Sequence, residues 1–413
     1  MKALSRPILV ATVAALVSAC GAGTASPAAS PAATAPSPAV AGASASPSIT
    51  IGLLVPFTES AINSDRGVAQ RRAAELYVAQ HGGTVGGQTA GFAYEDESIN
   101  GQLDVTKAQE LVQQHAVAVL GLLGDDGATA VRAYADSTKV PLLITGASGD
   151  SITRAAASPY VFRASYSNWQ LSEPLGEWAA RKGAAKVYLV HAPDTFGTES
   201  AAAFAAGLGK AGGTATANVA AQPGADWAKV VAAVKAQPAK AVFAAFEGAD
   251  AVSFLTAWAE AGMSAAGYSL YGPGTLTDTT VLASVKDAAA GVTTSMFWAD
   301  SAGGADLRAL MAAFPKAYLD DAGNPAPVTA DVVAMWDAMT ALGQAVQAAG
   351  TGSDALAKAV AAETVAGVRG SFAFDPATHN VVQDIYIRKV VLSAGAASNA
   401  IVDTVPQVAD PGH

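Results

Sequence analysis

This sequence has a single cysteine, Cys20, among its 413 residues. No second cysteine is available for a disulfide or for a paired metal site. The five histidines are scattered, and no two have a spacing that would place them together on one helix face. Charged residues make up only 14%, and acidic residues (34) outnumber basic ones (24). We therefore expect no metal, no cofactor and no nucleic-acid partner.

Catalytic motifs are missing as well. The sequence contains no nucleophile elbow and no glycine-rich phosphate loop. The neighbouring acids Glu95 and Asp96 follow a predicted strand, where adjacent side chains point to opposite faces and cannot act together as acid and base. We expect that the protein is not an enzyme.

The first 19 residues have the pattern of a signal peptide. Lys2 and Arg6 form a basic start, residues 8–17 are apolar, and small residues precede Cys20. The apolar run is about half the roughly 20 residues that a membrane span needs. The ending VSAC (17–20) resembles a bacterial lipobox, in which cleavage leaves the cysteine as a lipid-modified N-terminus. This predicts a protein exported from the cytoplasm and anchored to the bacterial cell membrane through Cys20; the alternative is an ordinary signal peptide with an incidental cysteine.

Residues 20–47 form the next segment. After Cys20 it consists almost entirely of Ala, Ser, Pro, Gly and Thr, with no aromatic and no charged residue. Such a composition buries too little apolar surface to offset the entropy cost of ordering the chain. We expect a flexible linker here, followed by about 360 residues, enough for two domains.

The remaining sequence alternates β-branched runs with helical patterns. This alternation predicts an α/β fold with parallel sheets and helices on both faces. The predicted strands are 49–55, 91–94, 117–120, 141–145, 186–190, 214–219, 241–245, 268–271, 291–297, 371–374 and 383–391. The predicted helices are 65–80, 102–115, 128–137, 168–183, 199–211, 227–237, 249–261, 307–319, 329–349 and 354–362.

In open α/β sheets a ligand lies outside the carboxyl ends of the strands. The loops at these ends come from both halves of the predicted order, which fits two facing lobes. They are residues 56–59, 95–97, 124–126, 146–148, 194–196, 246–248 and 298–300.

Several strings, taken in order, suggest a family. They are IGLLVPFT (51–58), ED (95–96), PLLI (141–144), YVFR (160–163) and GSFAFDP (370–376). Together they resemble the leucine/isoleucine/valine-binding protein family of solute receptors for ABC transporters. The resemblance implies the type I periplasmic-binding fold, in which two Rossmann-like lobes are joined by a three-segment hinge.

The same resemblance implies the domain boundaries and the partners. Lobe one would comprise residues 48–165 and 299–370, lobe two residues 166–298 and 371–400, and residues 401–413 would be a tail. The expected partners are a small-molecule solute and the permease subunits of an ABC transporter in the membrane. The receptor itself is expected to be a monomer.

The resemblance also implies ligand contacts. Gly146, Ala147 and Ser148 stand where the family holds a ligand carboxylate with backbone N–H groups and a hydroxyl, although Ser148 could instead cap a helix. Phe196 matches an aromatic that covers the ligand, although a lone Phe is usually part of a core. The weaker candidates, each a pocket wall or a packing residue, are Thr58, Phe246, Glu247 and Trp298.

The departures from the family concern the ligand's amine. Relatives that bind α-amino acids tend to have a serine in the loop that is Gly124-Asp125-Asp126 here, and a glutamate near Gly274. The loop after the first strand also carries Glu59 in place of glycine. An amine would then need Asp125, Asp126 or Glu247 as its partner, whereas the two aspartates could equally be helix caps.

The sequence therefore predicts a receptor that captures a small polar metabolite, such as an amino acid or an amide, for an ABC-type permease. The alternative is a sensory receptor on the same fold that passes its bound state to a signalling partner.

Overall fold

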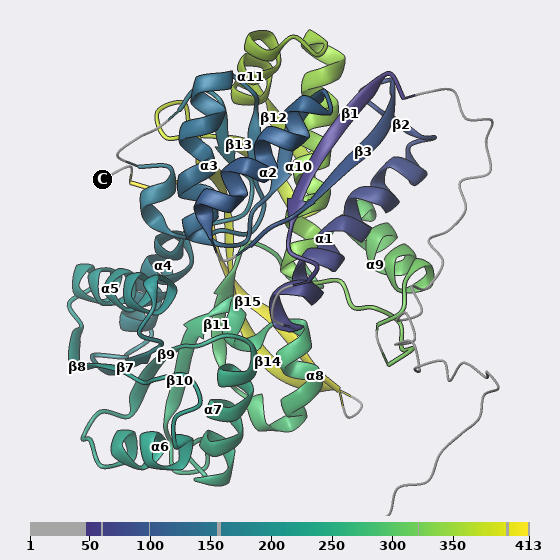
Figure 1. The fold of residues 1–413 in the computed structure, drawn as a ribbon. Coiled ribbons are helices and arrows are strands. Elements are labelled where there is room, and N and C mark those ends of the chain that lie inside the picture. Colours follow the sequence, from purple (N-terminus) through teal and green to yellow (C-terminus); the bar gives the residue numbers. More distant parts are fainter. Residues whose placement is uncertain are drawn as a thin grey trace, which may run out of the picture. The chain divides into compact units, whose positions relative to one another are not determined.

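A computed structural model (Figure 1) describes residues 47–58, 61–98, 100–154, 158–320, 322–393 and 396–411. The predicted signal peptide, the lipidation site Cys20 and the linker up to residue 46 lie outside these ranges, as does Glu59. No helix in the described ranges is both long enough and apolar enough to cross a membrane.

The first sheet has six strands in the order β2-β3-β1-β4-β5-β6. The strands β3, β1, β4, β5 and β6 run parallel to one another, and β2 pairs antiparallel with β3. The strands are β1 (Ile49–Val55), β2 (Thr84–Val85), β3 (Gln88–Asp96), β4 (Ala116–Gly121), β5 (Leu142–Ile144) and β6 (Val161–Arg163). The helices of this part are α1 (Ala61–Gln80), α2 (Gly101–Gln113), α3 (Asp125–Thr138) and the short 3-10 helix η1 (Asp150–Ile152).

The second sheet has nine strands. Its main order is β12-β13-β14-β11-β10-β9-β7-β8, and β15 pairs with β14. The strands are β7 (Lys186–His191), β8 (Thr214–Ala220), β9 (Ala241–Ala245), β10 (Ser269–Pro273), β11 (Thr293–Met296), β12 (Thr364–Gly367), β13 (Gly370–Phe374), β14 (Val381–Ser393) and β15 (Ala396–Val408). β7 to β11 are parallel as predicted, and the late strands add antiparallel pairs, so the sheet is mixed.

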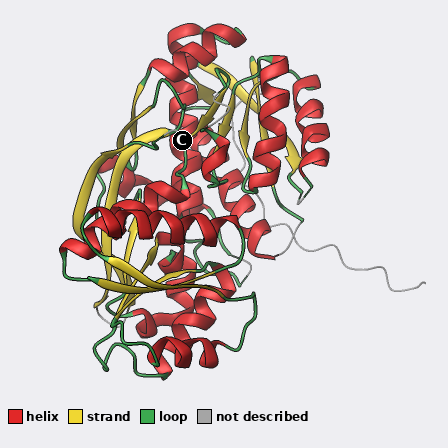
Figure 2. Ribbon diagram, turned by 90° about the vertical axis from the view of Figure 1, so that its left-hand side faces the viewer, coloured by secondary structure: helices red, strands yellow, loops and turns green. Residues whose placement is uncertain are grey.

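Helices flank the strands of both sheets (Figure 2). Those that follow β6 are α4 (Asn168–Arg181), α5 (Thr195–Lys210), α6 (Trp227–Lys235), α7 (Gly248–Glu260), η2 (Gly274–Thr277), α8 (Thr279–Val285), η3 (Lys286–Ala289), α9 (Ala305–Ala317), α10 (Ala330–Ala349) and α11 (Ser353–Ala362). The ten predicted helices correspond in order to α1–α7 and α9–α11, and the short helix α8 was not predicted.

Burial on both faces explains the continuous apolar strands. In β9, Val242 and Ala244 enter one core cluster, while Phe243 and Ala245 enter the cluster on the opposite face. Alternate residues of a strand point to opposite faces, so a strand covered on both sides has apolar residues at successive positions. This is why the predicted strand 241–245 and the observed β9 coincide.

Helix α5 begins earlier than predicted. Asp194 is its N-cap, and its Oδ1 accepts a hydrogen bond of 2.8 Å from the N–H of Gly197. An Asp side chain satisfies one of the unpaired donors at a helix start. Residues 194–196, which we expected to be a loop at the end of β7, are therefore the cap and first turn of α5.

The expected tail, residues 401–413, contains most of a strand. β15 (Ala396–Val408) pairs antiparallel with β14 along its length. Beyond it, the buried carboxylate of Asp410 accepts hydrogen bonds from Arg154 (2.7 Å) and from the hydroxyl of Ser167 (2.6 Å). The tail prediction is thus corrected, because these residues complete a sheet and anchor it to distant segments.

Candidate functional site

The loop after β5 presents backbone donors to carboxylates. The N–H groups of Ser148 and Gly149 both donate to Oδ1 of Asp125, each at 2.9 Å. The next N–H, of Asp150, donates to Oε2 of Glu199 on α5 at 2.8 Å. Three consecutive N–H groups thus bind carboxylates from α3 and α5. We call residues 145–150 the donor loop.

A buried arginine holds the donor loop from its other side. Arg163, the last residue of β6, is fully buried. Its Nη1 donates to the carbonyl oxygen of Ser148 (3.1 Å) and its Nη2 to that of Gly149 (2.8 Å). Because the carbonyl oxygens are fixed by Arg163, the N–H groups of the loop are directed away from it.

Gly146 and Ala147 occupy packed positions in the same loop. A Cβ on Gly146 would lie 2.8 Å from Cγ of Leu123, so only glycine fits there. Ala147 is completely buried, and its N–H donates to the carbonyl oxygen of Leu122 at 2.9 Å. These two residues set the course of the loop, and the structure gives them packing contacts.

A second group of polar residues surrounds Arg66 on α1. Arg66 forms a two-point ion pair with Asp331 of α10, with Nε–Oδ2 at 3.0 Å and Nη2–Oδ1 at 3.1 Å. Tyr166, Glu247 and Asp278 lie within electrostatic range of this pair. We call these five residues the Arg66 cluster. It holds one cation, three carboxylates and a buried phenol.

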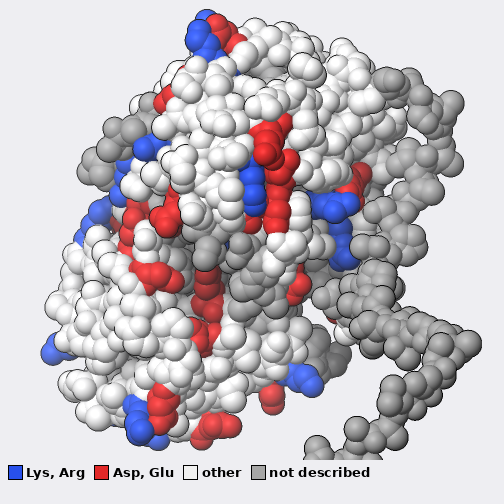
Figure 3. Space-filling view, in the orientation of Figure 1, with Lys and Arg blue, Asp and Glu red and all other residues white. Residues whose placement is uncertain are grey.

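Glu247 is the exposed member of this cluster. It follows β9 and is the N-cap residue of α7, but its side chain does not bond to the helix start. Glu247 is exposed to solvent, but the surrounding protein desolvates its carboxylate and so raises its pKa. Arg66 lowers this pKa in part, whereas the charges of Asp194 and Asp331 raise it further. Acidic side chains are spread down the middle of the face seen in Figure 3. An accessible carboxylate among other carboxylates attracts a cation or a hydrogen-bond donor.

Asp278 and Tyr166 are also perturbed. Burial and the nearby Asp331 raise the pKa of Asp278, and Arg388 and Arg66 lower it. Burial raises the pKa of Tyr166, which remains a neutral hydrogen-bonding group. Titratable groups with shifted pKa values gather at functional sites more often than elsewhere.

Gln70 links the two groups of residues. This fully buried side chain donates from Nε2 to the carbonyl oxygen of Thr145 (3.2 Å) and to Oδ1 of Asp331 (3.4 Å). Its Oε1 accepts a bond of 2.7 Å from the hydroxyl of Thr145. The donor loop and the Arg66 cluster are therefore parts of one connected site.

Three further predicted residues make other contacts, and a fourth, Asp126, is exposed. Thr58 bonds to Asp96, which holds the end of β1 against β3. Asp126 is exposed in the first turn of α3, beside Asp125. Phe196 and Phe246 are buried in two different core clusters. The ring of Phe246 packs edge-on against Trp227, so packing is the observed role of both rings, and a ligand contact by them stays a prediction.

Trp298 and Gly274 lie on either side of a buried arginine. Arg388 donates from Nη1 to the carbonyl oxygen of Trp298 (3.1 Å) and from Nη2 to that of Gly274 (3.2 Å). A Cβ on Gly274 would lie 2.6 Å from Sδ of Met296 and 2.8 Å from Nη2 of Arg388. A glutamate cannot occupy this position, which gives a physical reason for the departure seen in the sequence. Indole Nε1 of Trp298 is buried without a hydrogen-bond partner in the described residues.

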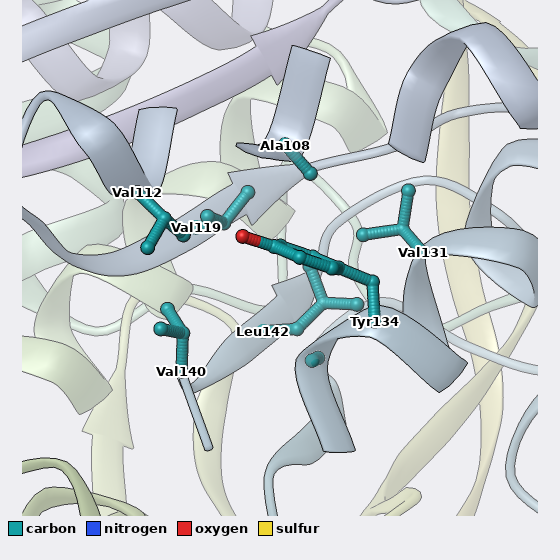
Figure 4. Close-up of a pocket in the computed structure, with 8 residues that line it drawn as sticks. Ala108, Val112, Val119, Val131, Tyr134, Val140 and Leu142 are labelled. Carbon is teal, nitrogen blue, oxygen red and sulfur yellow. The ribbon is translucent and has the colours of Figure 1, made fainter. Parts of the chain in front are cut away.

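A small cavity in the first half of the chain is not part of this site (Figure 4). It measures about 10 Å³, and Figure 4 shows the ring of Tyr134 in its middle. Its lining is apolar and consists of Ala108, Val112, Val119, Val131, Tyr134, Ala135, Val140 and Leu142. A space of this size barely holds one water. Within the described ranges, no three His, Cys, Asp or Glu side chains are grouped to hold a metal ion.

Sequence reasoning missed Arg66, Tyr166, Asp278 and Asp331. Arg66 and Asp331 are 265 positions apart, and no local pattern connects them. The position of Arg66 in the helix directly after β1 was the one available signal, because this helix starts at the ligand-binding edge of a parallel sheet.

Comparisons with known proteins agree with this architecture. A family model described as periplasmic binding protein matches residues 48–396. Leu/Ile/Val-binding protein homolog 6 of Brucella melitensis is 30% identical over 375 residues, which cover 88% of this chain and 93% of the relative.

Two solved structures from Rhodopseudomonas palustris are similar in fold and in sequence. One is a solute binding protein of an ABC transporter in complex with 3,4-dihydroxybenzoic acid, with 28% identity, a TM-score of 0.79, and coverage of 88% of this chain and 99% of that one. The other, in complex with benzoate, has 29% identity, a TM-score of 0.77, and coverage of 88% and 98%.

Proposed function

We propose that this chain, which belongs to the periplasmic binding protein family, captures a small polar solute with an amine or amide group and delivers it to an ABC-type permease. The broader class is established: it is an extracytoplasmic solute-binding protein of an ABC transporter, with the type I periplasmic-binding fold. The relatives are named for branched amino acids or hold aromatic acids. The solute class proposed for this chain therefore rests on its own residues.

The exposed carboxylate of Glu247 is the observation that carries the proposal. It lies at the carboxyl end of β9, where ligands of α/β sheets bind, and within electrostatic range of the Arg66–Asp331 pair. Asp331 already neutralises the charge of Arg66. Asp278 caps α8 by accepting from the N–H of Thr280, whereas the side chain of Glu247 does not cap its helix and remains as an acceptor for N–H groups. A bond to a charged acceptor is stronger than a neutral one.

Closure of two lobes is the proposed mode of capture. Residues 48–165 and 299–370 would form one lobe, and residues 166–298 and 371–400, now extended through β15, the other. The Arg66 cluster draws residues from both sets, which supports a solute held between them. Hinge closure around a ligand is a common motion of two-lobed receptors.

The protein is proposed to be anchored to the outside of the cell membrane through Cys20, and the signal pattern before this residue supports the proposal. A Cys20→Ala protein should be recovered in soluble form and still bind its solute. Retention of this variant in the membrane fraction would contradict the anchor and leave the binding proposal intact.

Calorimetric titration of the purified protein tests the solute class. The panel contains amino acids, their amides, simple amines, sugars and benzoates. We expect saturable binding by members that carry N–H groups. Absence of saturable binding to every member, or binding of sugars or benzoates alone, would overturn the proposal.

A further inference from the structure

Asp125 binds the donor loop as an external anion would. One carboxylate oxygen, Oδ1, accepts from the N–H groups of both Ser148 and Gly149 at 2.9 Å. A Cβ placed on Gly149 would lie 2.8 Å from Oδ2 and 2.9 Å from Cγ of Asp125. The carboxylate therefore lies directly against the loop and occupies the space in front of its donors.

The surroundings of the loop favour a negative charge at this point. Successive backbone N–H groups that converge on one point form an anion-binding concavity. Behind them lies the buried guanidinium of Arg163, held by the carbonyl oxygens of Ser148 and Gly149. Asp125 is one of the carboxylates whose field stabilises the charge of Arg163.

Capping of its own helix does not explain the position of Asp125. The residue opens α3, whose N-cap is Gly124. Gly124 is held in turn by Glu97, whose Oε1 accepts from its N–H at 2.7 Å. The Asp125 side chain extends from this fixed backbone to a loop 23 positions further along the chain.

We propose that Asp125 fills an anion-binding loop from within the protein and thereby excludes solutes that would place a carboxylate on the N–H groups of Ser148 and Gly149. This inference rests on the proposed function and narrows it to amines and amides that offer no carboxylate to the donor loop. A second carboxylate at this point would meet the charge of Asp125 at close range and find both donors already bonded.

Benzoate and its neutral counterpart benzamide are suitable probes, because they differ only in the group that would meet the loop. Calorimetric titration with both is carried out on the wild-type protein, Asp125→Ala and Asp125→Asn. Asp126→Ala is the matched control: it removes the same charge from the same helical turn and leaves the contacts of Asp125 in place. Thermal unfolding of each variant identifies those that are folded.

We expect Asp125→Ala to bind benzoate at least tenfold more tightly than the wild type does, with a benzamide affinity that changes less than threefold. Asp125→Asn, which keeps the volume of the side chain, should show a smaller gain, and Asp126→Ala none. Equal benzoate affinity in the wild type and in the folded Asp125 variants would overturn the proposal, as would an equal gain in Asp126→Ala. A different result would contradict the proposed function, namely that the wild type binds neither amines nor amides.

Discussion

The carboxylate of Asp337 and the guanidinium of Arg369 form an ion pair in which Oδ2 and Nε are 2.6 Å apart and both side chains are almost completely buried. Nη1 of Arg369 also donates to the carbonyl oxygen of Ser165 (3.2 Å) and to Oε1 of Gln383 (2.6 Å). The guanidinium lies 4.3 Å from the ring centroid of Phe297. Arg369 therefore ties α10 to β14 and to the segments that follow β6 and β11.

Removing one partner of this pair should destabilise the protein strongly. We expect Asp337→Ala to lower the free energy of unfolding by about 3–5 kcal/mol, because it leaves a buried guanidinium without its counter-charge. Arg181→Ala breaks an exposed ion pair with Glu177 and should cost at most about 1 kcal/mol. Urea unfolding followed by circular dichroism measures both, and similar losses in the two variants would contradict this account.

Gly274 should not tolerate even one methyl group. Gly274→Ala places a Cβ within 2.8 Å of both Met296 and Arg388, and such overpacking typically costs about 1–3 kcal/mol. Gly209, near the end of α5, has open space where a Cβ would lie, with no contacting atom within 4 Å. Gly209→Ala should therefore be neutral or stabilising by up to about 1 kcal/mol. Thermal unfolding compares the two, and a stable Gly274→Ala protein would refute the steric explanation of this glycine.

Glu97 should make the stability depend on pH. Burial raises the pKa of Glu97 to about 8 from its ordinary value of 4.5, although the N–H groups of Gly124 and Leu123 lower it in part. The folded state thus binds a proton that the unfolded state releases. The stabilising contribution is complete below pH 4.5 and is lost as the pH rises to about 8, by up to about 1.4 kcal/mol per unit.

The test of this pH dependence is Glu97→Gln, whose amide oxygen retains an acceptor for the same N–H groups. The free energy of unfolding of the wild type minus that of the variant should decrease as the pH rises from 5 to 8. A difference that is constant over this range would show that Glu97 titrates normally.

Glu247 should confer a pH dependence on solute binding. A cationic solute requires the ionised carboxylate, and the pKa of Glu247 is raised. Affinity should therefore decline on acidification, starting at a higher pH than for an ordinary glutamate. We expect Glu247→Gln to bind at least tenfold more weakly at pH 8, consistent with loss of a charge-assisted bond, and to lack the decline. Calorimetry of the best solute from the panel measures both effects, and an unchanged pH profile in the variant would exclude Glu247 from the site.

The central strands were predictable from the sequence because both of their faces are buried. Residues 49–55 are apolar except for Thr50 and Gly52, residues 241–245 are apolar throughout, and the two runs match β1 and β9. β15 gave no such signal, since most of its residues are exposed or half-buried and it contains Pro406. A strand paired on one side only tolerates proline, so neither periodicity nor composition marks it.

The candidate site was predictable only as a set of loops. The rule that ligands bind at the carboxyl ends of strands led to Ser148, Asp125 and Glu247. It could not reveal that Asp125 bonds to the loop of Ser148, because that depends on side-chain geometry. Nor could it pair Arg66 with Asp331, since contacts between distant positions follow from the folded topology and leave no local pattern.

The position of β15 constrains the order in which the protein acquires its structure. Every other strand of the second sheet precedes β15 along the chain, yet β14 lies between β11 and β13 and also pairs with β15. During synthesis the sheet begins with β7 but cannot be completed until residues beyond 400 have been made. The first sheet uses only strands that precede residue 164, so it can form while the second sheet still lacks β14 and β15.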